Sequence, residues 1–354
     1  DDHNVNICNL NNSQHTILVS LPESVFPVAI ACPPKAVFGT MGKSATCKSF
    51  IVSSTDGYFH IINKSGRIEK SFEAHRGAVL GLKWSYDGNS FATCGEDGHI
   101  KIWSRSGMLR STLAKINVSI YGLSWGPRSE HIVHTFGKQL VIRSIRPNNT
   151  PIAWMAHEGM VLKVDWNPVN ELLISGGEDC KYKVWDSFGH MLYSGQIYDN
   201  PISSLSWKPD GQHFIIGSYN SLRLCDKIGW SYNMQKPNIG SLLDVAWSPD
   251  GTNVVAVGAT GGVLFAHVSE CCLECVGFEA VVSSAKTITI TNVRDESKDT
   301  LEFRDRILRV SLAYEHLIAL TTNQCHIYSV NNFNTPIIVD LKDATISLII
   351  QSQE

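Results

Sequence analysis

Five tryptophans recur at nearly equal distances along the chain. They stand in GLKWSYDG, GLSWGPRS, KVDWNPVN, SLSWKPDG and DVAWSPDG, at positions 84, 125, 166, 207 and 247, so that successive intervals are 41, 41, 41 and 40 residues. Each tryptophan is followed by a turn rich in Gly, Pro, Asp or Asn, then by an apolar run such as SFATCG, then by an alternating run such as HIKIWS. Period-two alternation between tight turns predicts strands joined by hairpins, about four in each period.

A period of about 40–45 residues with four strands is typical of one blade of a β-propeller. The two most regular copies, AHRGAVLGLKW…GEDGHIKIWS and AHEGMVLKVDW…GEDCKYKVWD, resemble the WD40 family. Seven blades are predicted from the outer-strand positions, which are Cys8, Ile62, Trp103, Arg143, Trp185, Cys225 and Phe265. The expected fold is all-β: a seven-bladed WD40 β-propeller over residues 1–268, its first blade incomplete at the N-terminus, followed by the start of a second, degenerate β-propeller over residues 269–354. Residues 35–48 are expected to form an inserted loop.

Two blades carry a histidine, a hydroxyl, an aspartate and a tryptophan at matching offsets. The two sets are His75, Thr93, Asp97 and Trp103, and His157, Ser175, Asp179 and Trp185. A hydroxyl, an imidazole and a carboxylate could form a nucleophilic triad. The blades that lack the histidine also lack the aspartate and the tryptophan, however, and a buried network is worth keeping only when it is complete. The WD40 resemblance implies that each set is a structural hydrogen-bonded tetrad, so no catalytic residue is expected.

Composition and motifs argue against several other classes of function. The net charge is −3 and Lys and Arg form no dense block, which disfavours nucleic acid as a ligand. No apolar run approaches the ~20 residues of a membrane-spanning helix, so no membrane insertion is expected. The cluster Cys271, Cys272 and Cys275 contains one CxxC pair, whereas a zinc site needs four ligands. We therefore expect neither a metal site nor a cofactor.

A second resemblance extends beyond the WD40 pattern. The stretches GRIEKSFEAHRGAVL, GMLRSTLA, GEDCKYKVWDSFG, LRLCDKIGWSY, LEFRDRI and NTPIIVDLK resemble a family of WD-repeat subunits of intraflagellar transport complex B. This resemblance implies two tandem propellers and a helical-repeat tail, with self-association possible through regions outside this chain. It also implies a non-enzymatic scaffold that contacts other complex B subunits in the cilium or flagellum, the basal body and the cytoplasm, and that serves cilium assembly.

Two other functions fit a propeller. One is an enzyme that uses the central channel, which would need several titratable groups on the inner strands. The other is a peptide reader or adaptor of another cytosolic complex, which usually needs an Arg cluster on one face. Because propellers host all three classes, the fold alone does not choose among them. The family resemblance favours the scaffold.

Partner contacts are predicted at three loops in the blades that lack a tetrad. These loops are AKINVS (114–119), IYDNP (197–201) and KPNIG (236–240), and the candidate residues are Lys115, Asn117, Tyr198, Asp199 and Asn238. Mixed polar loops with one aromatic residue suit a protein partner. The hairpin GWSYN (229–233) is an alternative contact, expected on the opposite face. Replacing Tyr198 and Asp199 is expected to weaken binding without changing stability.

Overall fold

The computed structural model describes residues 3–8, 15–34, 49–146, 149–268, 272–275, 277–293, 295, 297–341, 349 and 351–352. The chain divides into two compact units. The first contains residues 1–246 and 256–264, and the second contains residues 247–255 and 265–354. The predicted inserted loop at 35–48 lies outside the described residues.

Seven antiparallel sheets lie between Asn4 and His267 in the described part of the chain, as predicted for seven blades with an incomplete first one. In chain order their strands are β1 (Asn4–Cys8) and β2 (His15–Ser20); β3 (Pro27–Ala31), β4 (Ser49–Ser54), β5 (Tyr58–Asn63) and β6 (Ile68–Glu73); β7 (Val79–Trp84), β8 (Ser90–Gly95), β9 (His99–Ser104) and β10 (Leu109–Lys115); β11 (Leu123–Trp125), β12 (His131–Phe136), β13 (Gln139–Ser144) and β14 (Ile152–Met155); β15 (Val161–Trp166), β16 (Leu173–Gly177), β17 (Tyr182–Trp185) and β18 (Met191–Ser194); β19 (Ser204–Trp207), β20 (His213–Ser218), β21 (Ser221–Asp226) and β22 (Ser231–Gln235); β23 (Leu242–Trp247), β24 (Asn253–Gly258) and β25 (Val263–His267).

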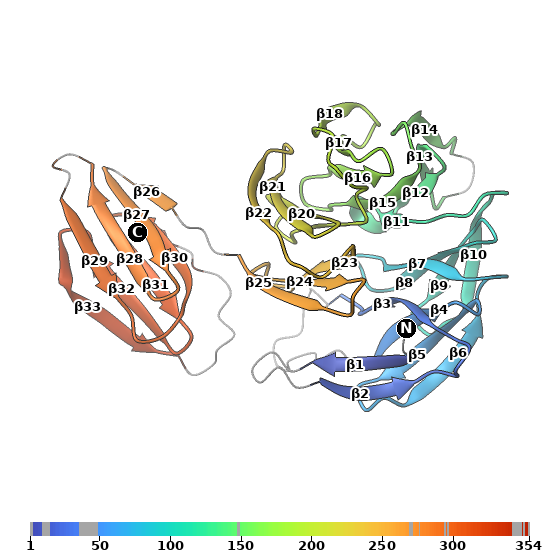
Figure 1. Cartoon of the computed structure of the whole chain (residues 1–354), viewed down its shortest axis with the longest axis horizontal. Coiled ribbons are helices and arrows are strands. Elements are labelled where there is room, and N and C mark those ends of the chain that lie inside the picture. Colours follow the sequence, from blue (N-terminus) through green and yellow to red (C-terminus); the bar gives the residue numbers. More distant parts are fainter. Residues whose placement is uncertain are drawn as a thin grey trace. The chain divides into compact units, whose positions relative to one another are not determined.

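The sheets are simple meanders, in which each strand pairs with the next one in the chain. In the first unit they follow one another around a common centre (Figure 1), and the inner strands β3, β7, β11, β15 and β19 contact their neighbours in turn. The only helical element among the described residues is one 3₁₀ turn, η1 (Pro127–Ser129). The WD40 propeller prediction is confirmed.

Turn chemistry explains why the strand that contains Trp84 ends at that residue. After Trp84, the Ser85 hydroxyl donates to an Asp87 carboxylate oxygen at 2.5 Å, and the same carboxylate accepts the Asn89 backbone N–H at 3.1 Å. Gly88 has a φ of +66°, a backbone conformation that glycine adopts without strain. The sequence SYDG therefore closes the hairpin between β7 and β8.

The apolar core lies between neighbouring blades. One cluster joins Ile100 and Ile102 of one blade to Leu123, Trp125 and Ile132 of the next, and all five are buried. Each sheet thus uses both faces for packing, which explains why β8 is buried at every position.

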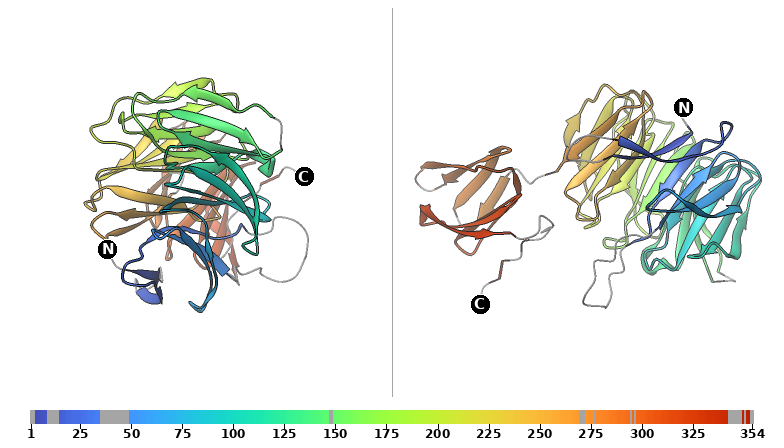
Figure 2. Two further views of the ribbon diagram at one scale, coloured as in Figure 1. Left: turned by 90° about the vertical axis from the view of Figure 1, so that its right-hand side faces the viewer. Right: turned by 90° about the horizontal axis from the view of Figure 1, so that it is seen from below.

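The second unit contains two further four-stranded antiparallel sheets. Their strands are β26 (Cys272–Cys275), β27 (Phe278–Ser284), β28 (Thr287–Asn292) and β29 (Lys298–Glu302), and β30 (Ile307–Ala313), β31 (His316–Thr321), β32 (Gln324–Ser329) and β33 (Asn332–Asp340). The two sheets lie face to face (Figure 2), and residues of both, among them Ile288 and Leu317, form one buried cluster. These sheets agree with the predicted start of a second propeller, and the boundary at 268/269 stays a prediction. No helix among the described residues is long and apolar enough to cross a membrane.

Candidate functional site: a groove between two blades

The structure brings together the four members of each predicted tetrad. In the first set, the Trp103 indole N–H donates to the Thr93 hydroxyl oxygen at 2.9 Å. The Thr93 hydroxyl lies 2.8 Å from His75 Nε2, and His75 Nδ1 lies 2.8 Å from an Asp97 carboxylate oxygen. Because an indole N–H can only donate, the hydroxyl proton goes to Nε2 and the imidazole proton on Nδ1 goes to the carboxylate.

The second set repeats this geometry 82 residues later. Trp185 Nε1 lies 2.8 Å from Ser175 Oγ, which lies 2.8 Å from His157 Nε2, and His157 Nδ1 lies 2.8 Å from an Asp179 oxygen. Both histidines are 3% exposed, and no pocket described below reaches either set. Both ring nitrogens of each histidine are therefore hydrogen-bonded within its own tetrad.

The electrostatics of each set agree with a neutral histidine beside an ionised aspartate. Burial lowers the pKa of His75 and His157 below the ordinary value, although the adjacent carboxylate opposes this shift. Burial alone would raise the pKa of Asp97 and Asp179. Hydrogen bonds from the histidines and from backbone N–H groups outweigh it, so both pKa values fall.

Each tetrad blade has a further lysine that sequence reasoning missed. The Lys101 ammonium donates to the Ala74 carbonyl, and the Lys183 ammonium donates to the Ala156 carbonyl at 2.6 Å. Both carbonyls belong to the residue that precedes the tetrad histidine. The signal was present in the sequence, because both lysines occupy the same offset in GEDGHIKIW and GEDCKYKVW.

The blade formed by β19–β22 has different residues at the tetrad positions. Counted from its repeat tryptophan, Trp207, the histidine position is Tyr198, the hydroxyl position is Ile216 and the aspartate position is Asn220. These three replacements all line one cavity of about 280 Å³. The cavity therefore occurs where the hydrogen-bonded tetrad has been lost.

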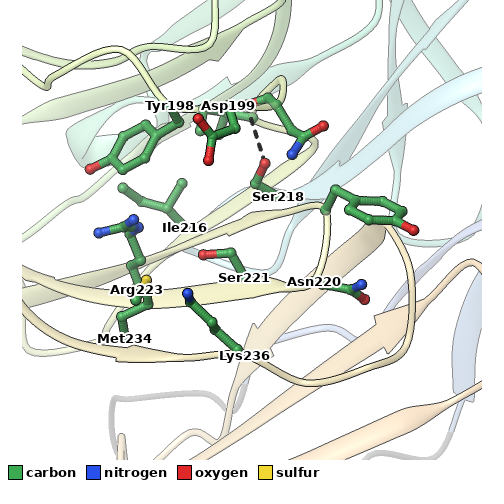
Figure 3. A pocket seen from close by; sticks show the side chains of 12 residues that line it. Tyr198, Asp199, Ile216, Ser218, Asn220, Ser221, Arg223, Met234 and Lys236 are labelled. Atoms are coloured by element: carbon green, nitrogen blue, oxygen red, sulfur yellow. Dashed lines mark hydrogen bonds between the residues drawn. The ribbon is translucent and has the colours of Figure 1, made fainter.

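Figure 3 shows how the walls of this cavity are arranged. Tyr198 and Asp199, from the loop 197–201, form one side, and Arg223 of β21 and Lys236 lie opposite them. The guanidinium carbon of Arg223 is 4.3 Å from the centroid of the Tyr198 ring, within the range of a cation–π contact. Asn220 accepts the Gly240 N–H at 2.7 Å and so attaches the predicted loop 236–240 to the same blade.

Tyr198 is half-buried, which corrects the expectation that it is a free surface residue. Its ring stacks on that of Tyr182 in the preceding blade, with centroids 5.7 Å apart and an interplanar angle of 26°. Its backbone N–H donates to the Cys180 carbonyl at 2.9 Å. The side chain therefore contributes to packing between blades as well as to the cavity wall.

A second cavity, of about 330 Å³, shares Tyr198, Asp199 and Arg223 with the first. It is also lined by Tyr193, Ile197 and Trp230. The GWSYN hairpin was expected on the opposite face from Tyr198, and its Trp230 lines the same cavity as Tyr198.

The two cavities, which share three lining residues, together form what we call the seam groove. The first is lined by the sheet β19–β22 and the segment 198–202, and the second also by Tyr182 and Tyr193 of the sheet β15–β18. Two large apolar residues that line the groove are exposed to solvent: Ile197 is 71% exposed and Trp230 is 64% exposed. The other predicted contact residues, Lys115, Asn117 and Asn238, are exposed but line neither cavity. Of the five predicted residues, the structure thus brings only Tyr198 and Asp199 together.

A polar network near the repeat tryptophans was also missed. Asp165 accepts hydrogen bonds from the Ser124 hydroxyl and from the Trp207 backbone N–H, both at 3.0 Å, and Lys83 Nζ lies 3.9 Å from the same carboxylate. Lys83, Ser124 and Asp165 each immediately precede a repeat tryptophan. A cavity of about 320 Å³ borders them. The network joins the inner strands β7, β11 and β15 through their side chains, and it reaches β19 through the Trp207 backbone N–H.

The described residues contain no group of three or more His, Cys, Asp or Glu side chains that could hold a metal ion. The cysteine cluster at 271–275 lies partly outside the described residues.

Comparison with known proteins supports the fold. The WD domain, G-beta repeat family matches residues 66–104, 149–186 and 189–226, and the family described as IFT80 second beta-propeller matches residues 270–354. A chain in the crystal structure of a mitotic checkpoint complex has a TM-score of 0.65 at 18% identity, and the match covers 75% of this chain and 82% of that one. That likeness concerns the fold alone.

Two curated proteins match along the whole chain. The intraflagellar transport protein 80 homologs of Rattus norvegicus and Mus musculus are each 48% identical over 353 residues, which is 100% of this chain. By sequence, this chain is a relative of intraflagellar transport protein 80. It spans 45% of the length of each of these two homologs. The F-box-like/WD repeat-containing protein TBL1Y of Homo sapiens is 27% identical over 35% of this chain and 27% of its own length, which is a more limited match than that to intraflagellar transport protein 80.

Proposed function

We propose that this chain is part of a non-enzymatic scaffold subunit of intraflagellar transport complex B. The observation that carries the proposal is the 48% identity to intraflagellar transport protein 80 homologs over the entire chain. Other complex B subunits are the proposed partners, in the trains needed to assemble cilia and flagella. The proposed locations are the cilium or flagellum, the basal body and the cytoplasm.

The structure supports a binding role in two ways. A ring of blades with cores between them is a rigid support whose seams and loops can vary without loss of packing. The seam groove is lined by Tyr193, Trp230 and Arg223, and tyrosine, tryptophan and arginine are enriched at the centre of protein interfaces. The histidine–aspartate pairs that resemble catalytic residues are occupied within their tetrads.

Affinity purification from ciliated cells tests this function. The full-length protein carries a tag, cells that express the tag alone serve as the control, and co-purifying proteins are quantified by mass spectrometry. We expect complex B subunits to be enriched, and the tagged protein to lie along the cilium and at its base. Enrichment of a different complex without complex B subunits would favour the adaptor function.

A further inference from the structure

The basic wall of the seam groove contains an arginine with one buried donor that has no hydrogen-bond partner in the described part of the chain. Arg223 Nε is buried and has no hydrogen-bond partner among the atoms that the structure describes. A buried donor without an acceptor is energetically unfavourable. The guanidinium packs over the Tyr198 ring, which orients it, and Arg223 lines both cavities of the groove.

The charges around this group favour an anion. Arg223 and Lys236 line the first cavity from one side, and Asp199 faces them from the other (Figure 3). Among the described side chains, no ion pair within 4 Å joins Asp199 to either cation. Asp199 is the only acidic residue that lines either cavity. A carboxylate that entered beside Arg223 would form a charge-assisted, bidentate pair.

The second cavity offers an apolar binding surface next to that charge. Its aromatic wall is continuous: the Tyr182 and Tyr193 ring centroids are 6.0 Å apart, and those of Tyr193 and Trp230 are 6.1 Å apart. Trp230 stands at the end of this row with 64% of its surface exposed. An apolar side chain placed against it would bury area that is now open to water.

The strand β22 borders the groove and is the last strand of its sheet in the described part of the chain. All five of its residues are exposed, so its outer edge offers backbone groups to an extended segment. In an extended segment, residues two positions apart point to the same side and are about 7 Å apart. That spacing suits two cavities that share a wall.

We infer that the seam groove binds an extended segment of a partner protein in which an apolar residue and an Asp or Glu stand two positions apart. The carboxylate pairs with Arg223 and Lys236, and the apolar side chain packs against Trp230 and Tyr193. This inference rests on the proposed function, because it names the kind of segment through which a train subunit would dock.

Selection from a random 12-residue peptide display library on the purified protein tests the inference. Enriched peptides are synthesised with a fluorescent label, and their Kd values are measured by anisotropy. We expect a shared apolar–x–acidic or acidic–x–apolar pattern, and a loss of affinity of at least about tenfold when the peptide acid becomes Asn or Gln. A consensus without an acid, or an acid whose replacement changes nothing, would overturn the inference.

Substitutions in the protein complete the test. Arg223→Gln and Trp230→Ala should each weaken the peptide at least about tenfold. The matched controls are Arg105→Gln and Phe188→Ala, which change an exposed arginine and an exposed phenylalanine that line neither cavity. Lys236→Gln, at an exposed position, serves in case Arg223→Gln impairs folding. Equal binding by Lys236→Gln, Trp230→Ala and the wild type would overturn the groove as the site.

The two proposals fail in different ways. If the wild-type protein purifies with complex B subunits and the groove variants retain all of them as well as the peptides, only the groove assignment is wrong. If the groove selects the expected peptides but no complex B subunit purifies with the wild-type protein, the proposed function is wrong. A peptide that binds only when its acid is replaced by phosphoserine would show that the carboxylate assignment is wrong.

Discussion

Ser124 donates a hydrogen bond to Asp165, which lies 41 residues later in the chain and on the next blade. The 3.0 Å contact spans one sequence repeat, and the second carboxylate oxygen of Asp165 accepts the Trp207 N–H of the blade after that. Blades are therefore joined by directional bonds as well as by apolar packing. The contribution of this network to the free energy of unfolding can be measured.

Replacing Asp165 by Ala should lower the free energy of unfolding by about 2–3 kcal/mol, because the Ser124 hydroxyl and the Trp207 N–H then lose their acceptor. Urea denaturation followed by tryptophan fluorescence measures the change. Asp244→Ala is the control, since Asp244 is an exposed aspartate on another inner strand. Equal midpoints for the two variants would show that the network adds nothing to stability.

A substitution within a tetrad should also lower the free energy of unfolding. Asp97→Ala leaves His75 Nδ1 and the Arg76 backbone N–H without their acceptor, and we expect a cost of about 2 kcal/mol in urea titrations. Lys138 occupies the same repeat position in a blade without a tetrad and is exposed, so Lys138→Ala should cost less than about 0.5 kcal/mol. An Asp97→Ala protein as stable as the wild type would contradict the structural role.

Stability should fall as the pH falls from 7.5 to 5. Burial lowers the pKa of His134 to about 4 from an ordinary value of 6.5. Between these values the unfolded chain binds the proton and the folded chain does not, so acid favours unfolding. Over this range His134 alone should account for a loss of about 2 kcal/mol.

The pH dependence is measured by urea titration at a series of pH values. His134→Gln should flatten the profile. A slope that is identical in the wild type and His134→Gln would exclude His134 as the cause.

Cysteine alkylation should separate two classes of thiol. Burial raises the pKa of both Cys94 and Cys225 to about 12, and both side chains are 0% exposed. Cys8, by contrast, is an exposed thiol. Under native conditions iodoacetamide should label Cys8 and spare the two buried cysteines, as read by peptide mass spectrometry. Rapid native labelling of Cys94 would show that its blade opens.

Tyr198 and Asp199 should have separable effects. Tyr198→Ala removes a ring that stacks on Tyr182, so we expect a stability cost of about 2 kcal/mol. Asp199→Asn changes an exposed carboxylate and should leave the urea midpoint within about 0.5 kcal/mol of the wild type. If Tyr198→Ala unfolds at the same urea concentration as the wild type, the stack does not hold the two blades together.

The sequence was sufficient to predict the blades and the four residues of each tetrad, because both depend on residues that recur at fixed offsets. The groove could not be found in this way. Tyr198, Ile216 and Asn220 appear in the sequence only as losses from the repeat pattern, and whether a lost bond leaves a space depends on the neighbouring blade. Here the Tyr198 ring stacks on Tyr182, and Arg223 packs over the same ring. The repeat period predicts neither contact.

The bond between Ser124 and Asp165 also bears on how such a ring could arise by descent. Because donor and acceptor occupy equivalent positions in consecutive repeats, a gene duplication that copies one whole repeat would bring a strand already spaced to meet its neighbours. A shorter duplication would shift every later polar position and leave the carboxylate without its partners. Natural selection could therefore enlarge or shorten an ancestor of this chain most readily in steps of one complete repeat.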